Sequence, residues 1–271
     1  MKIFDFNIHL PTLLDSNVNL TINQDLILDK EGVINGFLCH KQKIKRCSAI
    51  NILLFNSTLF NTSFLDVYSL FKNEIEIVKL TALIDFRQKD VFDYIDKLVA
   101  NGVSAILFNS YLQKITDNDF LQILEICKYA QNKKLIICID GSYGTSKMYE
   151  YENLKLACFI SDHIVLTQIV IVHGGSCNVI KAMLLAAEKN NVWLDTSFSL
   201  PYYINSSIEQ DFSFAIKKLN FSRIIYGSDH PYVDLNDAIS IHNDFFKKYN
   251  FTENQIEKIM YNNSLELFNV R

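Results

Sequence analysis

The stretch IVIVHGGSCN, residues 169–178, is an almost wholly apolar run that stops at His173 and turns on two glycines. A strand buried on both faces has such a continuous Val/Ile run, and its end is where a side chain first leaves the core. Strands of this kind belong to parallel sheets whose faces are covered by helices. His173 is therefore a candidate functional residue, and the rest of the chain decides whether it belongs to a site.

Similar apolar runs recur along the chain and alternate with stretches of helical spacing. The predicted strands are KIFDFNI (2–8), VINGFLC (33–39), IEIVKLTALID (75–85), GVSAILF (102–108), KLIICI (134–139), QIVIV (168–172), NVWLD (191–195) and RIIYG (223–227). Helical patterns lie at 91–102, 118–133, 178–191 and 211–220, several of them closing on Asn or Gly. This alternation indicates a parallel sheet with helical crossovers.

A closed (β/α)8 barrel and an open doubly wound sheet both satisfy this alternation. The open sheet that binds a dinucleotide needs a G-x-G-x-x-G turn after an early strand, and this chain of 271 residues with 8 glycines contains none. It also lacks a P-loop, an internal repeat and any Pro-rich or Gly/Ser linker. The sequence therefore predicts a single-domain (β/α)8 TIM barrel, an α/β fold, over residues 1–271.

Composition narrows the class of partner. The net charge of -4 provides no general attraction to nucleic acid or to an anionic membrane, and no run approaches the roughly 20 apolar residues of a membrane helix. The N-terminus lacks the pattern of a signal peptide, and the 6 cysteines include no C-x-x-C pair, which is typical of reduced core residues. We expect a cytoplasmic protein with a small-molecule substrate; whether it forms a homo-oligomer stays open.

The candidate site lies at the carboxyl ends of the predicted strands, where barrel enzymes hold their active sites. The polar residues at these ends are Asp5, Asn7 and His9 on the first strand, Asp140 after the fifth, His173 after the sixth, Asp195 after the seventh, and Asp229 followed by His230 after the eighth. Spacing by two predicts that the three residues of the first strand share one face. The pattern predicts a ring of His, Asp and Asn side chains at the barrel mouth.

Five of these motifs, in their order along the chain, resemble landmarks of the amidohydrolase superfamily. They are DFNIHL near the start, VIVHGGS, NVWLDTS, IIYGSDHP and the closing NNSLELFNV. The most similar branch is the amidohydrolase-related group (amidohydrolase 2), which includes decarboxylases and lactonases acting on small organic acids. The resemblance covers nearly the whole chain.

The resemblance implies a divalent metal, usually zinc, at the barrel mouth. In the family a D-x-H-x-H strand supplies two histidine ligands, strand five another histidine and strand eight an aspartate. Carried over, His9 is the second histidine of the first strand. His173 is the strand-six histidine that holds or polarises the substrate. Asp229 is the aspartate that binds metal or takes the proton of the attacking water.

Two positions depart from this pattern. Asn7 stands where the first histidine is expected, and Asp140 stands where the strand-five histidine is expected. The implied ligand set is therefore His9, Asn7, Asp140 and Asp229, which is rich in oxygen. Because an amide oxygen is a weak ligand for zinc, this set favours manganese or magnesium, binds zinc loosely, or binds no metal.

Two further residues are candidates for substrate binding. His230 is expected to line the pocket, and Arg87, just beyond the third predicted strand, to receive a substrate carboxylate. Each has a structural alternative, since His230 precedes Pro231 in a turn and Arg87 lies in a loop. Asp140 is equally suited to capping the turn DGSYG.

Three functions follow from these residues. The first is a metal-dependent hydrolase or decarboxylase of a small carboxylated or cyclic substrate, with Asp229 taking a proton and His173 stabilising negative charge. The second is a metal-independent lactonase-type hydrolase in which Asp229 activates water directly. The third is a catalytically silent barrel that binds a ligand, since fold and site are separable.

Overall fold

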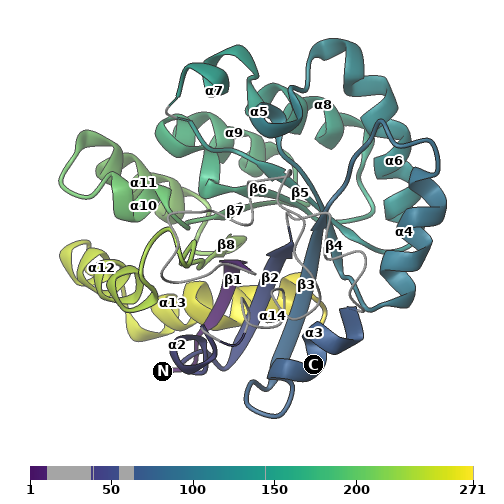
Figure 1. Cartoon of the computed structure of the whole chain (residues 1–271). Coiled ribbons are helices and arrows are strands. Elements are labelled where there is room, and N and C mark those ends of the chain that lie inside the picture. The colour runs from purple at the N-terminus through teal and green to yellow at the C-terminus, as the bar shows by residue number, and fades with distance from the viewer. Residues whose placement is uncertain (11–37, 39, 55–63, 144, 271) are drawn as a thin grey trace.

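Eight parallel strands form the barrel of this computed structural model, which describes residues 1–10, 38, 40–54, 64–143 and 145–270 (Figure 1). The strands are β1 (Phe4–His9), β2 (Ala49–Leu54), β3 (Ile77–Leu83), β4 (Ala105–Phe108), β5 (Ile136–Asp140), β6 (Ile169–Val172), β7 (Val192–Asp195) and β8 (Ile224–Ile225). They pair in chain order. The amide of Phe6 donates to the carbonyl of Tyr226 at 3.0 Å, and Ile8 bridges to His230, so the last strand lies beside the first. The predicted (β/α)8 barrel is confirmed.

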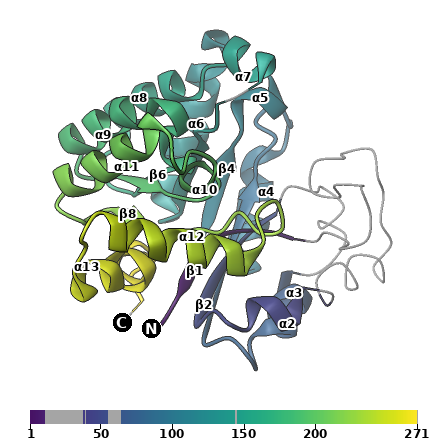
Figure 2. The same ribbon diagram turned by 90° about the vertical axis from the view of Figure 1, so that its left-hand side faces the viewer.

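Helices surround the strands on the outside (Figure 1). They are α2 (Lys41–Ile44), α3 (Phe64–Phe71), α4 (Val91–Ala100), α5 (Ser110–Gln113), α6 (Phe120–Asn132), α7 (Ser146–Glu150), α8 (Asn153–His163), α9 (Val179–Glu188), α10 (Ser199–Tyr202), α11 (Ser207–Lys218), α12 (Leu235–Lys248), α13 (Glu253–Glu257) and α14 (Asn263–Leu267). The chain also forms the 3₁₀ segments η2 (Asp117–Asp119) and η3 (His173–Asn178) and the π-helical segment η4 (Lys258–Asn262). Figure 2 shows α6, α8, α9 and α11 side by side, as expected for crossovers between successive parallel strands.

The second strand is not where the sequence predicted it. The predicted segment 33–39 lies largely outside the described residues, whereas β2 is formed by Ala49–Leu54, which is buried throughout. A polar residue, Asn51, interrupts its apolar run. The Asn51 amide donates to the carbonyl of Phe6 at 2.9 Å and accepts a hydrogen bond from Thr81 at 3.0 Å. These bonds offset the cost of removing the polar Asn51 side chain from water. The same polar residue weakened the apolar pattern from which a strand is predicted.

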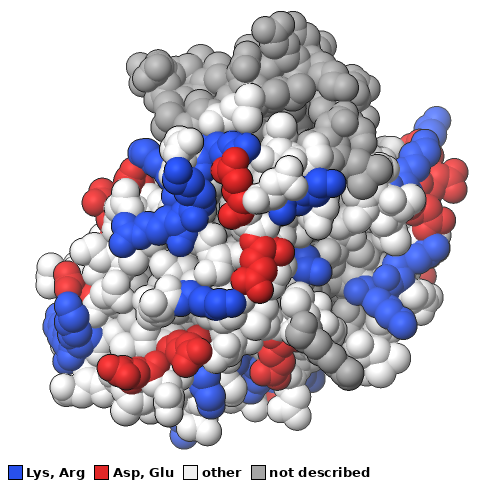
Figure 3. All heavy atoms as spheres, turned by 90° about the horizontal axis from the view of Figure 1, so that it is seen from below, with Lys and Arg blue, Asp and Glu red and all other residues white. Residues whose placement is uncertain are grey.

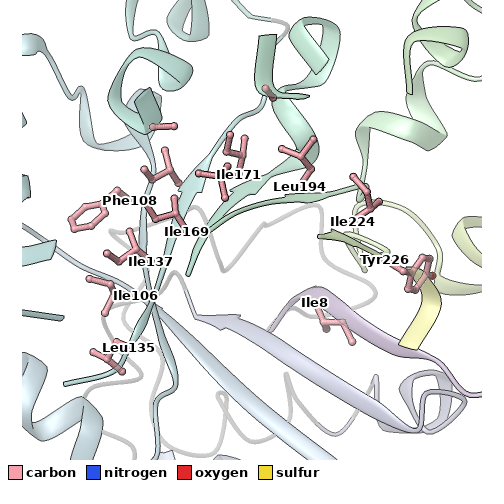
Figure 4. Packing of buried hydrophobic residues seen from close by; sticks show 14 of the residues in the cluster. Ile8, Ile106, Phe108, Leu135, Ile137, Ile169, Ile171, Leu194, Ile224 and Tyr226 are labelled. Atoms are coloured by element: carbon pink, nitrogen blue, oxygen red, sulfur yellow. The ribbon is translucent and has the colours of Figure 1, made fainter. Parts of the chain in front are cut away.

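Buried apolar side chains form two clusters that divide along the strands. In β5, Ile137 and Ile139 belong to the larger cluster, and Ile136 and Cys138 belong to the smaller one, which also contains Phe268. Such alternation is expected in a closed barrel, where successive side chains face the helices or the interior. Figure 4 shows part of the larger cluster on neighbouring strands. The interior is filled by side chains, so the space for a ligand is left at the strand ends.

The surface carries charges of both signs. Basic and acidic side chains are interspersed on the face seen in Figure 3. In the basic segment around α2, Lys41 lies 2.8 Å from Glu74 and Lys43 lies 2.6 Å from Asp234. This segment is therefore partly neutralised. Among the described residues, every helix is too short or too polar to cross a membrane.

Candidate active site

A cavity of about 160 Å³ opens at the carboxyl ends of the strands. The residues that line it are His9, Tyr111, Asp140, Ser142, Met148, His173, Phe198, Asp229 and Tyr232. Four of them, His9, Asp140, His173 and Asp229, are site residues that the sequence predicted. They come from β1, β5 and the segments that follow β6 and β8, because parallel barrel strands bring their carboxyl ends to one rim. His9, His173 and Asp229 therefore share one cavity.

Asp229 is the carboxylate around which the two histidines gather. Its Oδ1 lies 2.9 Å from Nε2 of His9 and 4.0 Å from Nε2 of His173. All three side chains are almost fully buried. A buried carboxylate requires such partners, because removing an unpaired ion from water is unfavourable by roughly several kcal/mol. The arrangement places a proton acceptor between two imidazole rings.

His173 is held from behind by Asp195 and Ser197 of the strand-seven end. Its backbone amide donates to Oδ2 of Asp195 at 3.1 Å, and its Nδ1 lies 3.2 Å from the carbonyl oxygen and 3.1 Å from the hydroxyl of Ser197. The Ser197 hydroxyl in turn donates to Asp195. Because Nδ1 faces two oxygen acceptors, it carries the proton, and Nε2 faces the cavity.

The charge of His173 depends on the carboxylates around it. Burial disfavours the imidazolium, but Asp229, Asp140 and Asp195 outweigh burial, and together they raise the pKa of His173 above its usual value. Nε2 of His173 lies 3.7 Å from Oδ2 of Asp140. His173 is therefore suited to present a positive charge to the cavity.

Asp140 combines the two roles that the sequence left open. It lines the cavity, and its oxygens also accept hydrogen bonds from Nδ2 of Asn109 at 3.0 Å, from the amide of Ser142 at 2.9 Å and from the Ser142 hydroxyl. The bond to the amide two residues ahead is that of an Asx turn. Both oxygens are thus engaged by neutral donors, which holds the carboxylate beside His173.

Asn7 and Asp5 do not line this cavity. The pairing of β1 with β2 shifts between Asp5 and Ile8, a bulge that breaks the two-residue alternation on which the prediction of one shared face rested. Nδ2 of Asn7 lies 2.6 Å from the Ser197 hydroxyl and 3.3 Å from Oδ2 of Asp195. Asn7 therefore belongs to the hydrogen-bond network behind His173.

Asp5 is buried behind the strand ends. Its Oδ1 accepts hydrogen bonds from the amides of Asn7 at 3.1 Å and Ser228 at 2.8 Å. Burial raises the pKa of Asp5 to about 7. It contacts the backbone of Asn7 and both the backbone and the side chain of Ser228, so it stabilises the turn that leads to Asp229.

The donor set does not fit a metal ion in this geometry. Asn7 faces Ser197 and Asp195, both oxygens of Asp140 accept hydrogen bonds, and His9 and Asp229 contact each other directly. Within the described ranges, no three His, Cys, Asp or Glu side chains are grouped as a metal-ligand set. Nε2 of His9, both oxygens of Asp140, Oδ1 of Asp229 and Nδ2 of Asn7 are therefore engaged in hydrogen bonds within the protein, whereas the buried Oδ1 of Asn7 has no such partner among the described residues.

The two predicted substrate-binding residues lie outside the cavity lining. Arg87 is about half exposed, pairs with Asp119 at 3.2 Å and donates to the carbonyl of Gln113 at 2.8 Å. His230 is buried, with Nε2 2.8 Å from Nδ1 of His40, and burial lowers its pKa to about 4. The positions of both side chains agree with the structural alternatives that the sequence left open, a loop arginine for Arg87 and a turn residue before Pro231 for His230.

The cavity walls include residues that sequence reasoning missed. They are Tyr111, Ser142, Met148, Phe198 and Tyr232. Tyr111, Phe198 and Tyr232 each follow a strand end or a motif residue by two or three positions. Their position close after a strand end could have indicated a place in the cavity wall, but an aromatic residue there is equally typical of the barrel rim.

Comparison with known proteins places the chain in a family. The family profile described as amidohydrolase matches residues 73–270, and the chain therefore belongs to the amidohydrolase family, a family of enzymes. The resemblance predicted from the motifs is thus confirmed. No curated protein matches the chain.

Solved structures with the same fold cover nearly the whole chain at low sequence identity. An uncharacterized TIM-barrel protein from Bordetella bronchiseptica has a TM-score of 0.70 and 14% identity, with 99% of each chain covered. A probable 2-pyrone-4,6-dicarboxylic acid hydrolase from Acinetobacter baumannii, solved with citric acid bound, has a TM-score of 0.66 and 15% identity, with 99% of this chain and 100% of that chain covered. A dihydroxybenzoic acid decarboxylase from Polaromonas, solved with manganese and 2-nitroresorcinol, has a TM-score of 0.63 and 14% identity, with 99% of this chain and 97% of that chain covered.

Proposed function

We propose that the protein is a hydrolase of a small carboxylated ring substrate, in which Asp229 activates the attacking water. The observation that carries this proposal is the position of Asp229, 2.9 Å from His9 and 4.0 Å from His173 inside the cavity of an amidohydrolase barrel. A buried carboxylate within reach of a bound water is a suitable general base. Family membership supports an enzyme over a silent barrel.

Each residue has a distinct part in the reaction. Asp229 takes a proton from water as the water oxygen bonds to the carbonyl carbon of an ester or lactone. His9 orients the carboxylate through Nε2, and the imidazolium of His173 stabilises the negative charge that develops on the carbonyl oxygen. The bond between carbon and the leaving oxygen then breaks, and the proton on Asp229 passes to that oxygen.

The substrate class rests on the cavity walls and on the relatives. Tyr111, Phe198 and Tyr232 present aromatic rings to a space of about 160 Å³, which suits a compact ring. The relatives include the hydrolase of a pyrone dicarboxylic acid and the decarboxylase of a dihydroxybenzoic acid. Both names denote small carboxylated rings, which supports the same class here.

Metal dependence stays a prediction of the family resemblance, supported by the manganese in the Polaromonas decarboxylase. The contacts of Asn7, Asp140 and Asp229 favour hydrolysis in which Asp229 acts on water directly. We therefore expect chelator-treated protein to retain its turnover, with metal content measured by plasma mass spectrometry. Turnover that returns only after manganese, magnesium or zinc is added back would contradict this expectation and establish the metal-dependent enzyme.

Replacement of the base tests the proposal. We expect Asp229→Asn to lower turnover by about 10²-fold or more, because the amide cannot accept the proton. The assay screens lactones, esters and aryl carboxylic acids, with release of acid or CO₂ as the measurement. Asp244→Asn, a change at an exposed carboxylate on α12, is the matched control. Equal turnover by Asp229→Asn and wild type, or binding of ring carboxylates without any turnover, would contradict the proposal.

A further inference from the structure

Phe198 occupies a strained turn between β7 and α10. Its φ and ψ angles are 53° and −57°, and the amide of Ser199 donates to the carbonyl of Ser197 across it. A hydrogen bond from residue i+2 to residue i with these central angles defines the γ-turn that is rare and strained for L-residues. A bulky residue with positive φ is a clear outlier. Such strain persists only where the surrounding structure holds it, and it clusters at functional sites.

Core packing does not account for this conformation. The Phe198 side chain is only partly buried, so it lacks the full burial that would offset backbone strain. Instead the ring lines the cavity, with its centroid 6.1 Å from the ring of His173 at an interplanar angle of 72°. The Ser197 carbonyl that closes the turn also lies 3.2 Å from Nδ1 of His173. One turn therefore presents an aromatic wall to the cavity and holds His173.

The aromatic wall continues from the cavity to the surface. Tyr202 stacks on Phe198 with ring centroids 5.5 Å apart and an interplanar angle of 16°, and it is 68% exposed. Tyr203 packs edge-on against Tyr202 at 5.0 Å, and its hydroxyl lies within 3.4 Å of the Ser176 hydroxyl. Tyr202 thus supports the outer face of Phe198 while its own face remains open to solvent.

We propose that Phe198 is a specificity-determining residue that packs against the planar ring of the substrate, with Tyr202 as its support. This inference rests on the proposed function, in which a ring carboxylate enters the cavity. A planar ring gains offset-stacked or edge-on contacts with Phe198 that a puckered ring of the same size and charge does not gain. The protein therefore discriminates by ring shape.

Two probes of equal charge test this inference directly. Benzoate is planar and cyclohexanecarboxylate is puckered, and both are monoanions near neutral pH. Isothermal titration calorimetry measures the ratio of their dissociation constants on the wild type. We expect benzoate to bind about tenfold more tightly. Phe198→Leu keeps an apolar side chain but removes the ring, so we expect its ratio to fall close to one.

Two further variants make the result specific. Tyr202→Leu leaves the strained turn unchanged, and we expect it to lower the ratio roughly two- to threefold by removing the support of the Phe198 ring. If Phe198→Leu fails to give the circular dichroism spectrum of the folded protein, the ratio measured on Tyr202→Leu serves as the test instead. Phe214→Leu changes an aromatic residue that is 52% exposed on α11, and we expect it to keep the wild-type ratio.

The outcomes separate this inference from the function on which it rests. Equal binding of both probes by the wild type would overturn the discrimination by ring shape and leave a hydrolase of carboxylates standing. A wild-type ratio that survives in Phe198→Leu, or in Tyr202→Leu when that variant carries the test, would also overturn the inference alone. Absence of binding by both probes would overturn the inference together with the carboxylated substrate.

Discussion

His173 and Asp229 have positive backbone φ angles of 61° and 65°. Non-glycine residues are uncommon in this left-handed region, although aspartate and histidine are both enriched there. In both cases, the surrounding hydrogen bonds and packing hold the residue. For His173 these include the bonds to Asp195 and Ser197, and for Asp229 the contact with His9. At the residue scale, backbone strain and buried charge therefore coincide at the same cavity.

Asp140 provides a test of the charge on His173. Because Asp140 is one of the carboxylates that raise the pKa of His173, Asp140→Asn should lower it. The imidazolium is present below this pKa and is lost as pH rises through it. We therefore expect the alkaline limb of the pH–rate profile to move to lower pH. The measurement is turnover against pH on the substrate found by screening.

The matched control for this prediction is Asp119→Asn, which removes a carboxylate that pairs with Arg87 at the surface. We expect its pH–rate profile to follow that of the wild type. An alkaline limb that stays in place in Asp140→Asn would show that the charge of His173 does not depend on this carboxylate.

At the scale of elements, η3 turns the chain sharply between β6 and α9. Gly174 and Gly175 have φ angles of 60° and 81°, which favour glycine. A Cβ atom added to Gly174 would lie 2.9 Å from the carbonyl oxygen of Asp195, which is backbone and cannot move away easily. The glycine thus allows the end of β6 to approach the end of β7. This approach brings His173 within reach of Ser197.

We expect Gly174→Ala to destabilise the protein by roughly 3 kcal/mol, since a left-handed L-residue and a backbone clash add together. Gly102→Ala is the control: its φ is 86°, but a Cβ there has nothing within 4 Å. Strain alone should reduce the stability of this variant by about 1.5 kcal/mol. Urea unfolding measures both free energies. Equal losses in the two variants would show that the close approach to Asp195 has no energetic effect.

At the scale of the whole molecule, the two ends of the barrel have separate tasks. Phe268 packs at the end where β1 begins, with its ring centroid 5.5 Å from that of Phe4 and an interplanar angle of 7°. His9 ends the same strand, roughly 16 Å further along at the usual rise per residue. The apolar end closes the core, and the polar end forms the cavity.

This separation predicts that a substitution at the apolar end of the barrel changes stability without changing activity. We expect Phe268→Ala to lower the free energy of unfolding by about 3 kcal/mol, because it leaves a cavity between Phe4 and Phe6, while turnover per folded molecule stays at the wild-type level. Urea unfolding and turnover at low temperature are the two measurements. Phe214→Ala, at an exposed aromatic residue, should change neither. A loss of turnover per folded molecule in Phe268→Ala would contradict this prediction and show that packing at one end of the barrel affects the cavity at the other.

Part of the site was predictable from sequence because strand ends are visible in it. His9, Asp140, His173 and Asp229 each close or follow an apolar run, and a parallel barrel must bring such positions to one rim. The role of Asn7 was not predictable. A bulge adds one residue locally without changing the apolar pattern that identifies a strand.

The sequence by itself determined the alternation of buried strands and helices, apart from the second strand, and the absence of a dinucleotide-binding glycine turn then favoured the barrel and the rim where its polar residues meet. Local period and strand length suffice for the alternation, because they depend on which side chains leave water. Only the tertiary structure decided that Asn7 supports His173, that Arg87 pairs away from the cavity and that Phe198 forms its wall. These outcomes depend on hydrogen bonds and packing between residues far apart in the chain, which no local pattern records.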